Sequence, residues 1–203
     1  MIAGVVLAAG RSTRMGTPKL LLTLSGRSVL RHVVDHVRAS RCGEIVVVVG
    51  ETADRMAEEV RAPGVRVVVN DRYREGMGTS LAAGVSMLSP DCDAAVVLLG
   101  DQPCVTPEVI DALIDAYRRT HKPIVASRYG DVTGAPTLIG AALFNEARRL
   151  EGDVGGRFLI QQHPDLVEEV QVSPSAAVDV DTPEEFARLR AALEEGAAPP
   201  GSV

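Results

Sequence analysis

The chain has 203 residues and a formal net charge of −6 at pH 7, and only 3% of its residues are aromatic. This length predicts one α/β-sized domain, and the acidic balance argues against a nucleic-acid surface, which needs a basic stripe or aromatic platforms. The three cysteines have neither the even number nor the spacing of a disulfide framework or zinc site. No apolar run reaches membrane-span length and the apolar start lacks a cationic leader, so we expect a cytoplasmic protein.

Strand and helix patterns alternate along most of the chain. Strands are predicted at 5–8, 44–49, 65–69, 94–99 and 124–127, with helices at 28–39, 51–61, 78–88 and 107–119. A strand or hairpin interrupted by glycine and proline follows at 133–139, then helices at 141–150 and 156–162, a strand at 167–172 and a helix at 183–194. This alternation predicts an α/β fold with a doubly wound, mainly parallel, Rossmann-like sheet of about seven strands. We expect residues 1–195 to form a single domain and 196–203 to be a disordered tail.

The first strand runs into a loop at 10–19 that is rich in glycine and cations. Gly10 and Gly16 allow positive φ angles and a close approach of backbone N–H groups to phosphate oxygens. Arg14 and Lys19 add positive charge. Ligands of parallel sheets bind beyond the carboxyl ends of strands, so this loop predicts a site for a nucleoside triphosphate. Neither the dinucleotide fingerprint nor the P-loop pattern fits its glycine spacing.

Two carboxylates are expected at the same edge of the sheet. Asp101 follows the strand at 94–99, and Asp181 precedes the last helix, for which Thr182 is the predicted N-cap. Magnesium takes one or two carboxylates together with substrate phosphate oxygens, which suits this pair. A turn aspartate and an ordinary residue at a helix start remain the alternative interpretations.

Two common catalytic arrangements do not fit. Ser12 has no adjacent histidine or lysine base, so we expect it to hydrogen-bond a phosphate instead of acting as a nucleophile. His32 and His36 are four residues apart on a predicted helix but have no further clustered ligand, which favours a position on the helix surface over a metal site.

The polar loop at 70–80 lies between a strand and a helix, so its backbone amides are candidates for contacts to a base or ribose. The alternative is that Thr79 or a neighbour provides a helix N-cap. The glycine-containing segments 134–136 and 151–157 are either part of a second substrate pocket or ordinary surface loops.

The run from Leu7 to Lys19 resembles the L-A-A-G-x-S-x-R-M-G-x-P-K signature of the MobA-like NTP transferases, and the segments 100–103 and 179–183 are similar to the acidic motifs of that family. The resemblance implies a fold of the nucleotide-diphospho-sugar transferase type, Mg²⁺ held by Asp101 and Asp181, and catalytic roles for Arg14, Lys19 and Asp101. The nucleotide contacts that it implies are Leu7, Ala8, Ala9, Gly10, Ser12, Arg14, Gly16, Lys19, Gly76, Thr79, Ser80 and Asp101.

Segments 134–136 and 151–157 also resemble the molybdenum cofactor cytidylyltransferase (MocA-like) branch of the family. This implies an acceptor pocket formed by Gly134, Pro136, Gly152, Asp153 and Arg157. The implied reaction transfers CMP from CTP to the phosphate of a molybdopterin-type molybdenum cofactor and releases pyrophosphate, with a molybdoenzyme or its chaperone as a candidate partner.

The base choice stays open, because the glycines at 76 and 78 remove side-chain cues. The alternatives are a molybdenum cofactor guanylyltransferase, a sugar- or polyol-phosphate nucleotidyltransferase, and a non-enzymatic module that binds nucleotide or cofactor during maturation.

Overall fold

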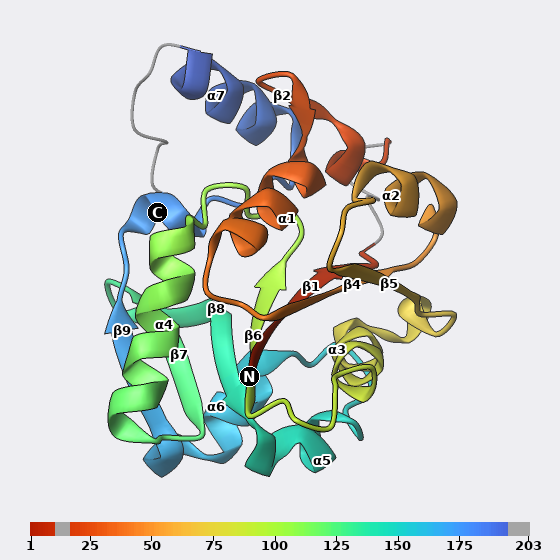
Figure 1. The fold of residues 1–203 in the computed structure, drawn as a ribbon. Coiled ribbons are helices and arrows are strands. Elements are labelled where there is room, and N and C mark those ends of the chain that lie inside the picture. Colours follow the sequence, from red (N-terminus) through yellow and green to blue (C-terminus); the bar gives the residue numbers. More distant parts are fainter. Residues whose placement is uncertain (11–16, 195–203) are drawn as a thin grey trace.

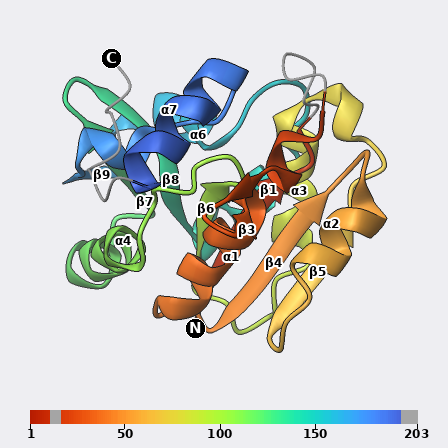
Figure 2. The same ribbon diagram turned by 90° about the horizontal axis from the view of Figure 1, so that it is seen from above.

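The computed structural model describes residues 1–10 and 17–194, and seven of its strands form one sheet in the order β5-β4-β1-β6-β8-β7-β9 (Figure 1, Figure 2). These strands are β1 (Ile2–Ala8), β4 (Glu44–Val49), β5 (Val65–Val69), β6 (Ala94–Leu99), β7 (Ile124–Tyr129), β8 (Val132–Gly140) and β9 (Val167–Gln171). Two short strands, β2 (Thr23–Leu24) and β3 (Arg27–Ser28), pair separately. The tail expected at 196–203 and the loop residues 11–16 lie outside the described residues.

Helices cover both faces of the sheet, which confirms the doubly wound α/β prediction (Figure 1). One face carries α1 (Val29–Ala39), α2 (Ala53–Glu59), α4 (Pro107–Thr120) and α7 (Pro183–Glu194). The other carries α3 (Met77–Ser86), α5 (Phe144–Ala147) and α6 (Gly156–Gln162). Within residues 1–10 and 17–194, no helix combines the length and apolarity needed to cross a bilayer.

The centre of the sheet is parallel and fully buried. Every residue of β1 is buried, and this strand pairs in parallel with β4 on one side and β6 on the other. A strand covered on both faces has no solvent-facing positions, which is why its sequence is a continuous apolar run. The chain winds away from β1 in opposite directions on its two sides, so the crevice beyond the ends of β1 and β6 is the expected ligand position.

Strand β8 runs antiparallel to both of its neighbours, β6 and β7. The predicted strand or hairpin at 133–139 is therefore the second strand of a β7–β8 hairpin, whose turn contains Gly130 at φ +58°. Because of its reversed direction, β8 begins at the edge where the parallel strands end. This places Gly134 and Ala135 at the ligand crevice.

The predicted helix at 141–150 is shorter and less regular than expected. A 3₁₀ turn covers Ala141–Leu143, and α5 continues only to Ala147. The backbone N–H of Ala141 donates to Asp93 O at 2.8 Å, so the start of the segment is held by a distant loop. The chain then turns away at Gly152, which has φ +69°.

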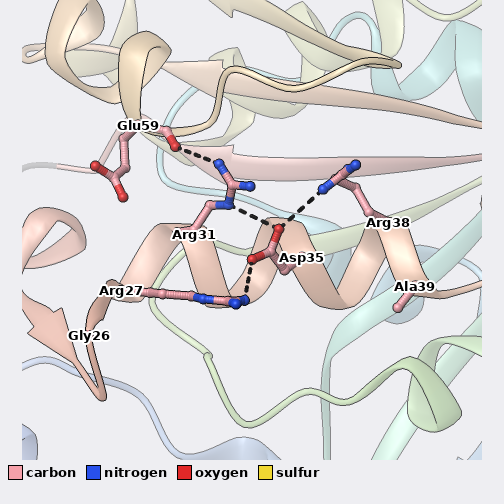
Figure 3. A pocket seen from close by; sticks show the side chains of 7 residues that line it. All are labelled: Gly26, Arg27, Arg31, Asp35, Arg38, Ala39 and Glu59. Carbon is pink, nitrogen blue, oxygen red and sulfur yellow. Dashed lines mark hydrogen bonds and ion pairs between the residues drawn. The ribbon is translucent and has the colours of Figure 1, made fainter.

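Three arginines of the α1 region converge on one half-buried carboxylate (Figure 3). Asp35 lies 2.9 Å from Arg27, 3.0 Å from Arg31 and 3.5 Å from Arg38, and Arg31 also donates to the backbone oxygen of Glu59 at 3.2 Å. Arg31 therefore links α1 to the end of α2. We assign this cluster a structural role, because its guanidinium groups are bonded to the protein itself.

Candidate active site

Lys19, Asp101 and Asp181 meet at the carboxyl edge of the sheet. The Nζ atom of Lys19 lies 2.5 Å from Oδ2 of Asp101 and 2.6 Å from Oδ1 of Asp181. Sequence motifs predicted these residues at one edge of the sheet, and the structure places the Lys19 ammonium in contact with both carboxylates.

The turn after β6 fixes the position of Asp101. The backbone N–H of Gly100 donates to Leu7 O at 2.9 Å, which ties the end of β6 to β1. The backbone oxygen of Asp101 accepts a hydrogen bond from Val180 N at 3.1 Å. The segment that carries Asp181 is thus held against the same turn by a backbone bond that does not involve Lys19.

A capping box at the start of α7 fixes the position of Asp181. Glu185 N donates to Oγ1 of Thr182 at 3.2 Å, and Oε2 of Glu185 accepts from the backbone N–H groups of Asp181 and Thr182 at 3.0 and 2.9 Å. The predicted cap at Thr182 is confirmed. Both acids therefore have independent backbone supports, so they stay close even though their charges repel.

A third acid, Asp179, lies behind this pair. Burial and the nearby charge of Asp101 raise the pKa of Asp179 to about 6. Its Oδ1 accepts from Nε2 of Gln102 at 2.8 Å, while the buried Oε1 of Gln102 has no hydrogen-bond partner in the described part of the chain. Burial alone would lower the pKa of Lys19, but Asp101 and Asp181 raise it above its ordinary value, so the ammonium is charged at neutral pH.

The donor set suits a magnesium-like ion that is completed by substrate. Among residues 1–10 and 17–194, no group of three or more histidines, cysteines or acids is arranged to hold a metal. Zinc and calcium sites in proteins use more ligands than the two carboxylates present here, whereas Mg²⁺ is commonly held by one or two carboxylates and substrate phosphates. Asp101 and Asp181 fit that pattern.

A cavity of about 280 Å³ opens beside Asp101 at the ends of β1 and β6. Most of the described residues expected to contact nucleotide line it: Leu7, Ala9, Gly10, Gly76, Ser80 and Asp101. Four further residues line this cavity and were not among the predicted contacts: Tyr73, Arg74, Met77 and Leu99. The sequence feature that could have indicated Tyr73 and Arg74 as lining residues is an aromatic residue next to a cationic one in a loop after a strand. In the structure, Arg74 Nε donates a hydrogen bond to the Tyr73 hydroxyl at 2.9 Å.

Some predicted contacts are placed differently. Ala8 points into the core on the opposite face from Leu7 and Ala9, because side chains alternate along a strand. Gly10 does not use the positive φ that glycine allows, and a Cβ added there would meet nothing within 4 Å. Ser12, Arg14 and Gly16 lie outside the described residues.

Buried hydrogen bonds organise the loop before α3. Asn70 Nδ2 donates to Thr79 Oγ1 at 2.9 Å and to Ser80 Oγ at 3.0 Å, and the Thr79 hydroxyl donates to Gly76 O at 2.9 Å. Both hydroxyl side chains are buried. Thr79 thus shapes the loop, whereas Ser80 also lines the cavity.

A second cavity, of about 310 Å³, adjoins the first and shares Leu7, Met77, Leu99 and Asp153 with it. Three predicted acceptor residues line this second cavity: Gly134, Asp153 and Arg157. Pro136 is buried, and its backbone oxygen accepts from Ser127 Oγ at 2.8 Å. Gly152 contacts the loop before α3.

The two glycine loops touch at Gly76 and Gly152. Gly76 has φ +117°, and a Cβ added there would lie 2.2 Å from the carbonyl atoms of Gly152. Gly78 N also donates to Gly152 O at 2.9 Å. The loop expected to contact nucleotide and the loop expected to contact acceptor therefore form one continuous wall.

Solved structures with the same fold include Rv0371c from Mycobacterium tuberculosis H37Rv, which is 34% identical with a TM-score of 0.85 and aligns 94% of this chain with 97% of that one. A complex of Rv0371c with manganese is also similar, at 33% identity, a TM-score of 0.78, and coverage of 94% and 98%. The nucleotidyl transferase Mth528 from Methanothermobacter is 26% identical with a TM-score of 0.82, and the alignment covers 97% and 99% of the two chains.

Sequence relatives have diverse names. Nicotine blue oxidoreductase of Paenarthrobacter nicotinovorans is 31% identical over 198 residues, which cover 93% of this chain and 96% of that protein. The bifunctional protein GlmU of Ralstonia pickettii is 33% identical over 149 residues, 72% of this chain and 32% of that protein. Residues 4–167 match the MobA-like NTP transferase domain. With the sheet order and the acid pair at its carboxyl edge, this match shows that the chain belongs to the MobA-like NTP transferase family of nucleotidyltransferases.

Proposed function

We propose that this protein transfers CMP from CTP to the phosphate of a molybdopterin-type molybdenum cofactor and releases pyrophosphate. The observation that carries the proposal is the contact of Lys19 with Asp101 and Asp181 beside two adjoining cavities, in a chain of the MobA-like NTP transferase family. The cavity that includes Asp101 would take the nucleotide. The cavity that includes Arg157 would take the anionic acceptor.

The acceptor can attack without a protein base. A phosphate monoester has a second pKa of about 6, so its oxygens are largely dianionic at neutral pH. An acceptor oxygen forms the new bond to the α-phosphorus of the triphosphate, the bond from that phosphorus to the bridging oxygen breaks, and pyrophosphate leaves with the electron pair. The protein has to hold two anions in line and neutralise the departing charge.

Asp101 and Asp181 would hold Mg²⁺, which neutralises phosphate charge when it is bound. A manganese complex of Rv0371c, which is 33% identical to this chain, supports a divalent ion in this family. Arg14 and Lys19 would stabilise the transferred and leaving phosphates. Arg157 lines the second cavity and would pair with an anionic group of the acceptor.

Pyrophosphate release tests this proposal. Purified protein with Mg²⁺ and molybdenum cofactor should release pyrophosphate with CTP and much more slowly with GTP. Sugar phosphates and polyol phosphates serve as competing acceptors, and mixtures without acceptor provide the background. Turnover only with GTP would identify a guanylyltransferase, turnover only with a sugar or polyol phosphate would identify that alternative, and nucleotide binding without any turnover would identify a maturation module.

The similarity to nicotine blue oxidoreductase favours a second candidate, an oxidoreductase activity. A reduced nicotinamide dinucleotide is also a nucleotide with a pyrophosphate, so it would occupy a similar crevice. The same mixtures are therefore assayed for oxidation of NADH and NADPH by their absorbance. Oxidation without pyrophosphate release would replace the transferase proposal.

A further inference from the structure

Lys19 occupies the position between two carboxylates that the proposed metal needs. Its Nζ atom contacts Oδ2 of Asp101 and Oδ1 of Asp181 at 2.5 and 2.6 Å, and the exposed fraction of its side chain is 12%. Magnesium binds carboxylate oxygens directly, so it would use acid oxygens that the ammonium already contacts. The ammonium and the metal would therefore compete for the same carboxylates.

The backbone at both acids is held by hydrogen bonds that do not involve Lys19. Val180 N holds the acidic segment to the backbone oxygen of Asp101, and Glu185 caps the backbone at Asp181. Two half-buried carboxylates held close together need a cation between them. The structure supplies that cation from the chain itself.

We propose that Lys19 is the resident counter-ion of this acid pair, and that it leaves the pair for a nucleotide phosphate when the divalent metal binds. The inference rests on the metal site of the proposed function. The ammonium excludes the metal from the acids in the free protein, while a triphosphate offers the displaced amine a new anionic partner. Metal and nucleotide therefore bind with positive coupling, for which a factor of about 5–150 is typical.

Metal affinity of the free protein tests the exclusion. Mn²⁺ is titrated without nucleotide and followed by the electron paramagnetic resonance signal of the free ion. Lys19→Met removes the charge and keeps most of the stem, so this variant should bind Mn²⁺ about tenfold or more tightly than wild type. Lys122→Met is the matched control, because Lys122 is the only other lysine of the chain and its ammonium contacts Asp165 O.

Asp101→Asn in the Lys19→Met background should abolish the gain in Mn²⁺ affinity. Equal Mn²⁺ affinity of wild type and Lys19→Met would overturn the inference, and so would a gain that survives Asp101→Asn.

The movement of Lys19 is measured on the wild-type protein, so it does not depend on the folding of a Lys19 variant. Protein labelled with ¹⁵N-lysine should give two ammonium signals in nuclear magnetic resonance spectra, because the chain has two lysines. The signal that is lost in Lys122→Met belongs to Lys122, and the other belongs to Lys19. Mg²⁺ alone at submillimolar concentration should leave the Lys19 signal in place, and Mg²⁺ with CTP should shift it while the Lys122 signal stays. An unchanged Lys19 signal at saturating Mg²⁺ and CTP would overturn the inference.

These outcomes are separable from those of the proposed function. If pyrophosphate release depends on Asp101 but Lys19→Met gains no Mn²⁺ affinity, only the counter-ion role fails. If Lys19→Met gains Mn²⁺ affinity and no acceptor gives pyrophosphate, the transferase proposal fails and the counter-ion role stands.

Discussion

Asp101 and Asp181 both contact Lys19, and in the proposed reaction each would contribute one carboxylate to the metal. Asp101→Asn and Asp181→Asn keep the size of each side chain and remove its charge. Each substitution should lower kcat for pyrophosphate release by about 100- to 1,000-fold, the range for losing one electrostatic stabiliser.

Asp131→Asn is the control for these variants, because Asp131 is fully exposed in the β7–β8 turn, where it forms a long ion pair of 3.8 Å with Arg128. Its activity should equal that of wild type. Full activity of either Asp101→Asn or Asp181→Asn would contradict a role of that residue in binding the metal.

At the scale of elements, the contact between the loop before α3 and the loop before α6 depends on Gly76. An alanine there would have an unfavourable φ of +117° and a Cβ 2.2 Å from Gly152 backbone atoms. The φ of +117° and ψ of 174° at Gly76 belong to a region that is essentially restricted to glycine. Gly76→Ala should lower the free energy of unfolding by about 2–6 kcal/mol, the sum of this backbone penalty and overpacking.

Gly130→Ala separates the two terms of that loss, because Gly130 has φ +58° and open space around its missing Cβ. It should cost only the backbone penalty of about 1–2 kcal/mol. Urea unfolding followed by circular dichroism measures both variants. Equal losses would contradict the close packing of the two loops.

The packing of α1 against the segment that leads into α4 includes His36, whose Nδ1 lies 2.9 Å from Val105 O. Burial lowers the pKa of His36 below its ordinary value of 6.5. Between that lowered pKa and pH 6.5, the unfolded chain binds more protons than the folded chain, so the free energy of unfolding falls as the pH drops below 6.5.

His36→Gln should therefore lose less stability than wild type between pH 7.5 and pH 5.5, as measured by the urea midpoint. His121→Asn is the control, since His121 is exposed at the end of α4 and Asn tolerates its φ of +55°. If the urea midpoint of His36→Gln fell between pH 7.5 and pH 5.5 by as much as that of wild type, this prediction would be contradicted.

On the scale of the whole molecule, the acid pair and Lys19 join three distant parts of the chain at one edge of the sheet. A metal–nucleotide complex bound there stabilises the entire fold by mass action. At ligand concentrations near 100 times Kd, the gain is about 2.7 kcal/mol, which raises Tm by about 5–10 °C for a chain of this size.

Thermal scans with CTP and Mg²⁺ test that gain against CTP with a chelator. Asp181→Asn should keep the smaller shift of CTP alone and lose the additional shift from Mg²⁺. A Tm that Mg²⁺ does not raise in wild type would argue against coupled binding of metal and nucleotide.

Much of the architecture follows from local sequence. The strands β1, β4 and β6 are predictable because burial on both faces gives nearly continuous apolar runs, and their carboxyl ends share an edge in any parallel sheet. That rule also brought Lys19 and Asp101 to one edge of the sheet. The cap at Thr182 is a local interaction that sequence spacing specifies.

Other features depend on how distant segments are placed. The antiparallel pairing of β8 with β6 and the contact of Gly76 with Gly152 have no local sequence signal. Sequence motifs predicted Lys19 and the acids as separate functional groups, but only the tertiary structure placed the ammonium between the carboxylates. The physical reason is that strand order and turn geometry, acting across many residues, set distances that no short stretch of sequence encodes.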